Sequence, residues 1–167
     1  MSINGLDQLS HGELLMLEQR VRHDGTGISP SMVTGCWQPR SLWAAGRTEA
    51  SSLQALVLNL LGAQLLIENS PQDMEQPLLI SNSVRLGPIV LRFSGPGWFT
   101  GRRPLLMFRF VQLQLSLGSW RLLQRQLPQP KANKTPFFAL LAVTPRAWLL
   151  ARGRGGGLAL WSATKNP

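Results

Sequence analysis

Acidic residues are missing from the whole second part of this 167-residue chain. All eight Asp and Glu residues lie before residue 76, in a part that holds only four basic residues. Residues 76–167 contain thirteen Lys and Arg residues and no carboxylate side chain, so no side-chain salt bridge can form within them. The formal net charge is −4 before residue 76 and +13 after it. Such a basic surface attracts polyanions and anionic lipid headgroups over a screening length of about 8 Å.

Side chains that catalyse reactions are also scarce. Tyrosine is absent, and the single cysteine, Cys36, excludes an internal disulfide and a cysteine-based zinc cluster. We interpret Cys36 as a small buried residue, and His11 and His23 as surface residues at the two ends of a predicted helix. From residue 76 onward there is no Asp, Glu, His, Cys or Tyr, so we expect no acid–base or nucleophilic site there. The sequence favours a binding protein without a cofactor or a metal over an enzyme.

Long apolar runs are missing as well. The most apolar stretch, residues 53–67, is interrupted by Gln54, Asn59 and Gln64 and is shorter than the about 20 residues that span a bilayer as a helix. The first twenty residues contain three acidic side chains and no basic start followed by an apolar run, which is atypical of a secretory or transit peptide. We therefore expect a cytoplasmic protein.

The chain contains enough apolar residues to form a hydrophobic core, because 44% of the residues are hydrophobic and only 15% are charged. Ser10 and Glu13 form a capping box, and Leu14, Leu17, Glu18 and Val21 follow at helical spacing. This pattern predicts an N-terminal helix over residues 10–23. The Gly, Pro, Ser and Thr residues of 24–35 indicate a linker.

One further short helix is predicted by an apolar stripe at i, i+3, i+4 and i+7 spacing between Leu53 and Leu61, which ends at Gly62. We expect residues 1–29 to form the N-terminal helix and linker, and residues 30–167 to form the main domain.

Beyond Gly62 the chain changes to short apolar runs separated by turn residues, which is typical of antiparallel strands. The runs cover residues 63–69, 78–86, 89–93, 106–115, 120–127, 137–143, 147–152 and 158–163. Turns are predicted at Gly87-Pro88, at Ser94-Gly95-Pro96-Gly97 and at the Gly-rich segment 153–157, with a β-bulge near Phe110, where the alternation changes phase. Seven to nine strands with little helix predict a mainly β fold, as a barrel or a sandwich, because closure removes exposed sheet edges.

Three fragments of the chain match the pattern of a known family. They are Gly35-Cys36-Trp37 with Trp43, Asn82 ahead of Val84 and Leu86, and Leu150-Ala151-Arg152-Gly153 leading through Gly157 to Leu158 and Leu160. On these fragments, over roughly residues 30–165, the chain resembles the plastid-lipid-associated proteins, also called fibrillins. It departs from the family in lacking tyrosine, in having Thr144-Pro145-Arg146 where an acidic residue usually precedes the Arg-Gly turn, and in having Leu149 at the place of a further arginine.

The resemblance implies a lipocalin-like antiparallel β-barrel that binds lipids or other small apolar molecules without catalysis. It also implies association with photosynthetic membranes, in a plastid or a cyanobacterium-like cell. Because the first twenty residues are atypical of a transit peptide, we expect the cyanobacterial type. Gly35, Trp37, Arg152 and Gly153 are then structural residues. We expect Arg152 to pair with one of the carboxylates of residues 1–75. Charge reversal at Glu49 or Glu68 would test this pairing.

The alternation of apolar residues along the strands predicts which residues form the walls of a ligand cavity. The predicted wall residues are Phe93, Phe108, Phe110, Leu113, Trp120, Phe138 and Trp148. Trp98 and Phe99, at a predicted Gly/Pro turn ahead of Arg102 and Arg103, are expected to contact an anionic membrane surface. For the six tryptophans as a group the favoured interpretation is structural, as core residues that close and fill the sheet, and the alternative is that they line a ligand cavity or lie at a membrane interface.

Two other functions stay open. A basic β-barrel that binds nucleic acid is favoured by the +13 charge, and it requires exposed aromatic residues on a sheet face. The Arg-Gly segment at 152–157 adds little to this alternative, because it is short and a flexible turn explains its glycines. An interaction protein with a solid core is the other.

Overall fold

The computed structural model describes residues 11–45, 62–70, 75–101, 104–129 and 135–164. These residues form two helices, α2 (His11–Asp24) and α3 (Pro30–Val33), and ten antiparallel strands. The strands are β1 (Gly35–Trp43), β2 (Gln64–Asn69), β3 (Leu78–Leu86), β4 (Ile89–Thr100), β5 (Leu105–Phe108), β6 (Gln112–Leu117), β7 (Trp120–Gln126), β8 (Phe137–Thr144), β9 (Trp148–Gly153) and β10 (Leu158–Thr164). The expectation of a mainly β protein is confirmed.

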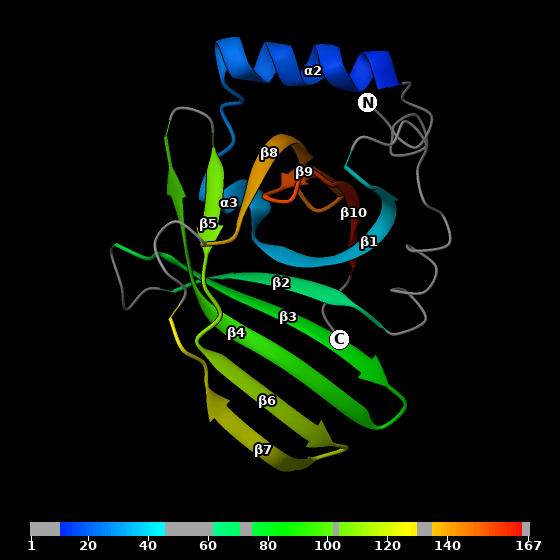
Figure 1. The fold of residues 1–167 in the computed structure, drawn as a ribbon, viewed down its shortest axis with the longest axis vertical. Coiled ribbons are helices and arrows are strands. Elements are labelled where there is room, and N and C mark those ends of the chain that lie inside the picture. Colours follow the sequence, from blue (N-terminus) through cyan, green and yellow to red (C-terminus); the bar gives the residue numbers. More distant parts are fainter. Residues whose placement is uncertain (1–10, 46–61, 71–74, 102–103, 130–134, 165–167) are drawn as a thin grey trace.

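Eight of the strands close into a ring, in the order β3, β2, β1, β10, β9, β8, β5 and β4, because β4 also pairs with β3 (Figure 1). The remaining two strands extend the sheet outside the ring. Strand β4 is 12 residues long, and its second half pairs with β5 while its first half pairs with β6. Residues 82–94 and 112–126 thus form a four-stranded sheet, called the extension below, at the opposite end of the molecule from α2.

Two apolar clusters lie on opposite faces of the ring. The inner cluster consists of Ile28, Val33, Trp37, Leu65, Ile67, Leu78, Ile80, Leu106, Phe108, Leu140, Leu149 and Ala151. The outer cluster lies under α2 and consists of Val21, Trp43, Leu141, Trp148, Leu150, Leu158 and Leu160. Alternate residues of strand β9 belong to the inner and the outer cluster. The strand is therefore buried on both faces, and its sequence is a continuous apolar run.

The N-terminal helix is confirmed, since α2 covers the predicted span to within one residue. The segment 24–35, expected to be a linker throughout, contains α3, and β1 begins at its last residue. The strand β1 itself was not predicted. The helix predicted between Leu53 and Leu61 lies outside the described residues.

The turn predicted at residues 94–97 is wrong, because these residues belong to β4. A Cβ atom on Gly95 would lie 2.0 Å from the carbonyl oxygen of Arg109, and one on Gly97 would lie 2.5 Å from Cδ1 of Ile80. Both glycines therefore permit close approach within the sheet rather than a change of direction. Near Phe110 the chain leaves β5 and rejoins β4 as β6, which explains the change of phase in the sequence.

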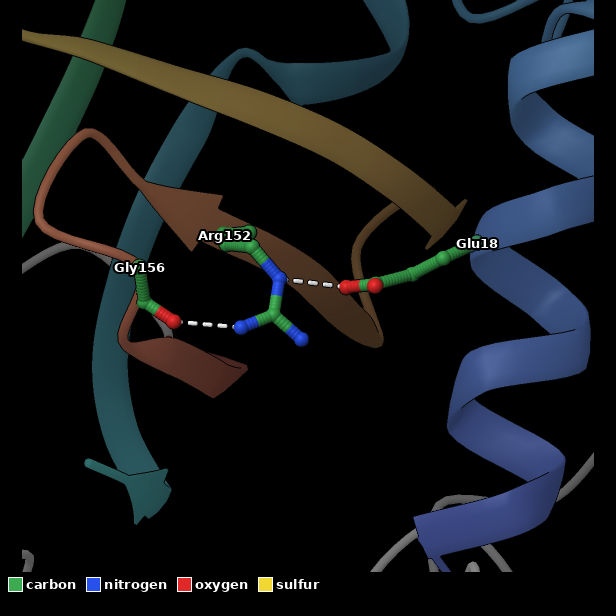
Figure 2. Close-up of polar contacts among 3 residues, drawn as sticks. All are labelled: Glu18, Arg152 and Gly156. Carbon is green, nitrogen blue, oxygen red and sulfur yellow. Dashed lines mark hydrogen bonds and ion pairs between the residues drawn. The ribbon is translucent and has the colours of Figure 1, made fainter. Parts of the chain in front are cut away.

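Helix α2 is attached to the ring by Arg152 (Figure 2). The guanidinium group of Arg152 donates a hydrogen bond from Nε to Glu18 and another from Nη1 to the carbonyl oxygen of Gly156. The expected pairing of Arg152 with a carboxylate of the N-terminal part is confirmed, but the partner is neither Glu68, which is exposed on β2, nor Glu49, which lies outside the described residues.

Candidate functional site

The strand register arranges the side chains of the extension in rows. Residues directly opposite each other on neighbouring strands point to the same face. Three rows share one face: Leu86, Ile89, Leu117 and Trp120; Val84, Leu91, Leu115 and Leu123; and Asn82, Phe93, Leu113 and Arg125. This face continues the inner face of the ring, because Ile80 of the inner cluster precedes Asn82 and Val84 by two and four positions on β3. We call it the inner face of the extension.

The opposite face of the extension has a different character. Its rows are Arg85, Val90, Ser116 and Arg121, and Ser83, Arg92, Gln114 and Gln124. Seven of these eight side chains are polar or charged, so this face suits water. The inner face has the composition of a core instead.

The inner face of the extension is exposed along its outermost row and along β7, and half-buried nearer the ring. Every residue of β7 is exposed, and Trp120 retains 73% of its surface, so the prediction that it forms a cavity wall is wrong. The physical reason is its place on the last strand of the sheet, beyond the ring. Contiguous exposed apolar patches are uncommon on soluble monomers, so this part of the face is a candidate binding surface.

A line of aromatic rings leads from the extension into the ring. The ring centroids are 5.8 Å apart for Phe93 and Phe110, 5.3 Å for Phe110 and Phe108, and 5.1 Å for Phe108 and Phe138. Trp161 ends the line, 6.4 Å from Phe138 and nearly perpendicular to it. Its Nε1 atom is buried and has no hydrogen-bond partner in the described part of the chain.

The structure thus brings together five of the seven residues nominated as cavity walls. Phe93, Phe108, Phe110, Leu113 and Phe138 all lie on the inner face. Trp148 does not, because it packs in the outer cluster under α2, and its nomination is therefore wrong. Trp161 was missed, although its two-residue spacing from Ala163 on one face of the last strand was a signal for it.

The residues expected to contact a membrane are placed differently from the prediction. Trp98 and Phe99 lie within β4 rather than on a turn. The guanidinium carbon of Arg109 lies 5.8 Å from the centroid of the Trp98 ring, and Phe99 packs against the inner cluster. Arg102 and Arg103 are outside the described residues.

The residues assigned a structural role have clear contacts. Trp37 is fully buried, and its Nε1 donates a hydrogen bond to the carbonyl oxygen of Val33 at 2.8 Å, which fixes α3 against the sheet. Gly35 has a φ of 140°, a conformation that favours glycine. Gly153 donates its backbone N–H to Gly157 at 2.8 Å and so closes the Gly-rich turn.

Two cavities open elsewhere on the ring. One of about 300 Å³ lies between α2 and the outer face, where Val21, Leu105 and Phe137 line it beside the Glu18–Arg152 pair. The other, of about 630 Å³, lies at the start of β1 and the end of β10. The buried side chains of the inner cluster lie on the inner face of the ring.

Groups for metal or acid–base chemistry do not gather in the described ranges. There, no three His, Cys, Asp or Glu residues come close enough to hold a metal ion. Cys36 is buried, and the imidazole of His23 contacts the carboxylate of its neighbour Asp24 at 2.7 Å on the surface.

Comparisons with protein-family models, curated proteins and solved structures find no match for this chain. Within the described residues, neither helix has the length and apolarity to cross a membrane. The function is therefore inferred from the geometry of the inner face.

Proposed function

We propose that this protein binds lipids or other small apolar molecules without chemically changing them, with its ring of strands acting as a lipocalin-like barrel. The observation that supports the proposal is the partly exposed apolar inner face of the extension, which continues into the ring through Phe93, Phe110 and Phe108. A ligand that covers this face removes apolar surface from water. Each large side chain that is fully covered contributes about 1.5–3 kcal/mol.

The dimensions of the face suit a small molecule. Four strands spaced about 4.8 Å apart make a surface about 14 Å wide. An acyl chain or a flat pigment-like ring system covers such a surface, and Phe93 and Phe110 offer it two tilted rings. Association with photosynthetic membranes, which the family resemblance implies, is part of the proposal because those membranes contain such molecules.

Nucleic-acid binding is the less favoured alternative. A single-stranded nucleic acid needs aromatic rings for its bases and cations for its phosphates along one groove. Here Arg85, Arg92 and Arg121 lie on the face of the extension opposite to the apolar rows, and of the four arginines in the extension only Arg125 shares the inner face. A strand that stacks on the inner face would therefore leave these arginines behind the sheet.

Two neighbouring residues of β6 provide a matched test. Leu115 lies on the inner face and Gln114 on the opposite one, so Leu115→Arg and Gln114→Arg add the same charge to different sides. We expect the wild-type protein to bind Nile red and Leu115→Arg to bind it at least about tenfold more weakly, because a charge must then be covered by the probe. Gln114→Arg should bind as the wild type does.

Native mass spectrometry of the protein purified from its own cells then identifies the bound molecule. A lipid or pigment that co-purifies with the wild type and not with Leu115→Arg supports the proposal. A protein that arrives without such a molecule, binds no Nile red and instead binds oligonucleotides with a steep salt dependence overturns it.

A further inference from the structure

The far end of the extension is built from two adjacent hairpin turns. One turn is Gly87-Pro88 and the other is Gly118-Ser119, and the N–H of Gly118 donates a hydrogen bond to the carbonyl oxygen of Pro88 at 2.8 Å. This bond joins the two turns into one edge. We call this edge, with the four apolar residues that flank it, the tip: Leu86, Ile89, Leu117 and Trp120.

The tip is the most exposed apolar part of the described chain. Trp120 retains 73% of its surface, Leu86 64% and Ile89 42%. The pairing of β6 with β7 shifts register between Leu115 and Ser116, which leaves Leu122 without a partner in the ladder and also exposed. Tryptophan and branched apolar residues on a rigid, projecting edge are what an interfacial membrane contact needs.

Arginines stand directly behind the apolar residues of the tip. Arg85 and Arg121 occupy the next row, about 3.3 Å further along the strands, and point to the opposite face. Their long side chains can lie along the sheet and place the guanidinium group at the level of lipid headgroups. No carboxylate side chain occurs anywhere between residues 76 and 167 to neutralise them.

We propose that the tip docks on an anionic lipid bilayer. Trp120, Leu86 and Ile89 enter the headgroup region, and Arg85 and Arg121 bind the negative headgroups around them. The apolar insertion and the charge attraction act together, which is the combination that peripheral membrane binding requires. This surface differs from Trp98 and Phe99, which the sequence pointed to. The tip is the outermost row of the inner face, so it adjoins the proposed ligand site, whose rows with Leu91 and Phe93 lie further in.

A second copy of the chain fits the same surface less well. Pairing between two copies of β7 is hindered by the charges of Arg121 and Arg125 and by the bulge at Leu122, which are devices that protect sheet edges. Two copies would also bring together surfaces of the same positive sign. An anionic bilayer has the complementary charge.

Sedimentation of the full-length protein with vesicles tests the proposal. The wild type should sediment with vesicles of phosphatidylglycerol and phosphatidylcholine, and more weakly with phosphatidylcholine alone. Trp120→Ser should lower the partition coefficient about tenfold. The matched control is Met16→Ser, which removes another exposed apolar side chain, on α2 at the other end of the molecule, and should sediment as the wild type does.

Substitution of the arginines should change how vesicle binding depends on salt. Arg85→Gln and Arg121→Gln should each weaken binding to the phosphatidylglycerol vesicles about fivefold at low salt and reduce its salt dependence. All variants change exposed residues, so their thermal unfolding should match that of the wild type.

Three results would overturn the docking surface. They are absence of vesicle binding by the wild type, equal binding by Trp120→Ser and the wild type, and a wild-type dimer in light scattering that Trp120→Ser converts to a monomer. The last result assigns the tip to a second copy. Leu91→Gln changes the row behind the tip, so it should weaken Nile red binding and leave vesicle binding as in the wild type. Trp120→Ser should weaken vesicle binding, so the two proposals can fail separately.

Discussion

Glu18 in α2 accepts a hydrogen bond from Arg152 in β9, although 134 residues separate them in the chain. The pair lies beside the outer cluster, and the Glu18 side chain is almost completely buried. Because apolar contacts have no preferred direction, they leave a helix free to slide over a sheet, whereas a charged hydrogen bond fixes its position. The pair also links the acidic first part of the chain to its basic remainder.

Removing the charge of Glu18 should loosen α2. We expect Glu18→Gln to lower the free energy of unfolding by about 1–2 kcal/mol, because Arg152 then loses its counter-charge in a poorly hydrated place. Urea unfolding followed by fluorescence measures this. The control is Glu68→Gln, the same change on the exposed part of β2, which should stay within about 0.5 kcal/mol of the wild type. Equal losses in both variants would contradict the assignment of the partner.

The close approach at Gly95 leads to a second prediction. In Gly95→Ala the new Cβ would meet the backbone oxygen of Arg109 at 2.0 Å. The segment of Arg109 cannot move away without losing the hydrogen bonds that Arg109 and Val111 donate to Pro96 and Ser94 of β4. We expect a loss of about 3 kcal/mol or more in urea unfolding, or no folded protein.

Gly155→Ala serves as its control, since no atom lies within 4 Å of a Cβ placed there. That variant should change the free energy of unfolding by no more than about 0.5 kcal/mol. If Gly95→Ala is equally well tolerated, β4 does not run through this position as described.

Substitutions in the ring should lower the free energy of unfolding, whereas substitutions in the exposed part of the extension should leave it almost unchanged. Leu149 in the inner cluster is 1% exposed, and Leu149→Ala should cost about 2–5 kcal/mol of unfolding free energy. Leu122 in the extension is 55% exposed, and Leu122→Ala should cost less than about 0.5 kcal/mol. Comparable losses in the two variants would mean that the extension is part of the folding core rather than a binding surface.

The sequence was sufficient for much of the local structure. The capping box of Ser10 and Glu13 locates α2, and the turn at Gly87-Pro88 separates β3 from β4 as predicted. Alternation also assigns Val84 and Leu86 correctly to one face. The sequence also contained an indication that Glu18 is the partner of Arg152, because Glu18 occupies a position at the spacing of the apolar residues of its helix.

The remainder depends on contacts between distant strands, which alternation does not contain. Alternation along a strand predicts that Trp148 and Leu150 lie on the same face. It does not predict whether that face points into the ring or toward α2. It likewise does not reveal that Trp120 lies on the last strand of the sheet, with no further strand beside β7 in the described residues. Gly95 resembled a turn residue because what requires a glycine there, the carbonyl oxygen of Arg109, belongs to the connection between β5 and β6, which is distant in sequence.

Two adjacent residues of β4 separate the proposed function from its alternative. Leu91 points to the inner face of the extension and Arg92 to the opposite, polar face. Leu91→Gln should weaken Nile red binding about tenfold, because it places an amide that must lose its water in the middle of the apolar rows. Arg92→Gln should leave Nile red binding unchanged. An oligonucleotide that binds the wild type at low salt, is lost with Arg92→Gln and is kept with Leu91→Gln would instead assign the working surface to the basic face, since phosphate contacts and not apolar coverage would then provide the affinity.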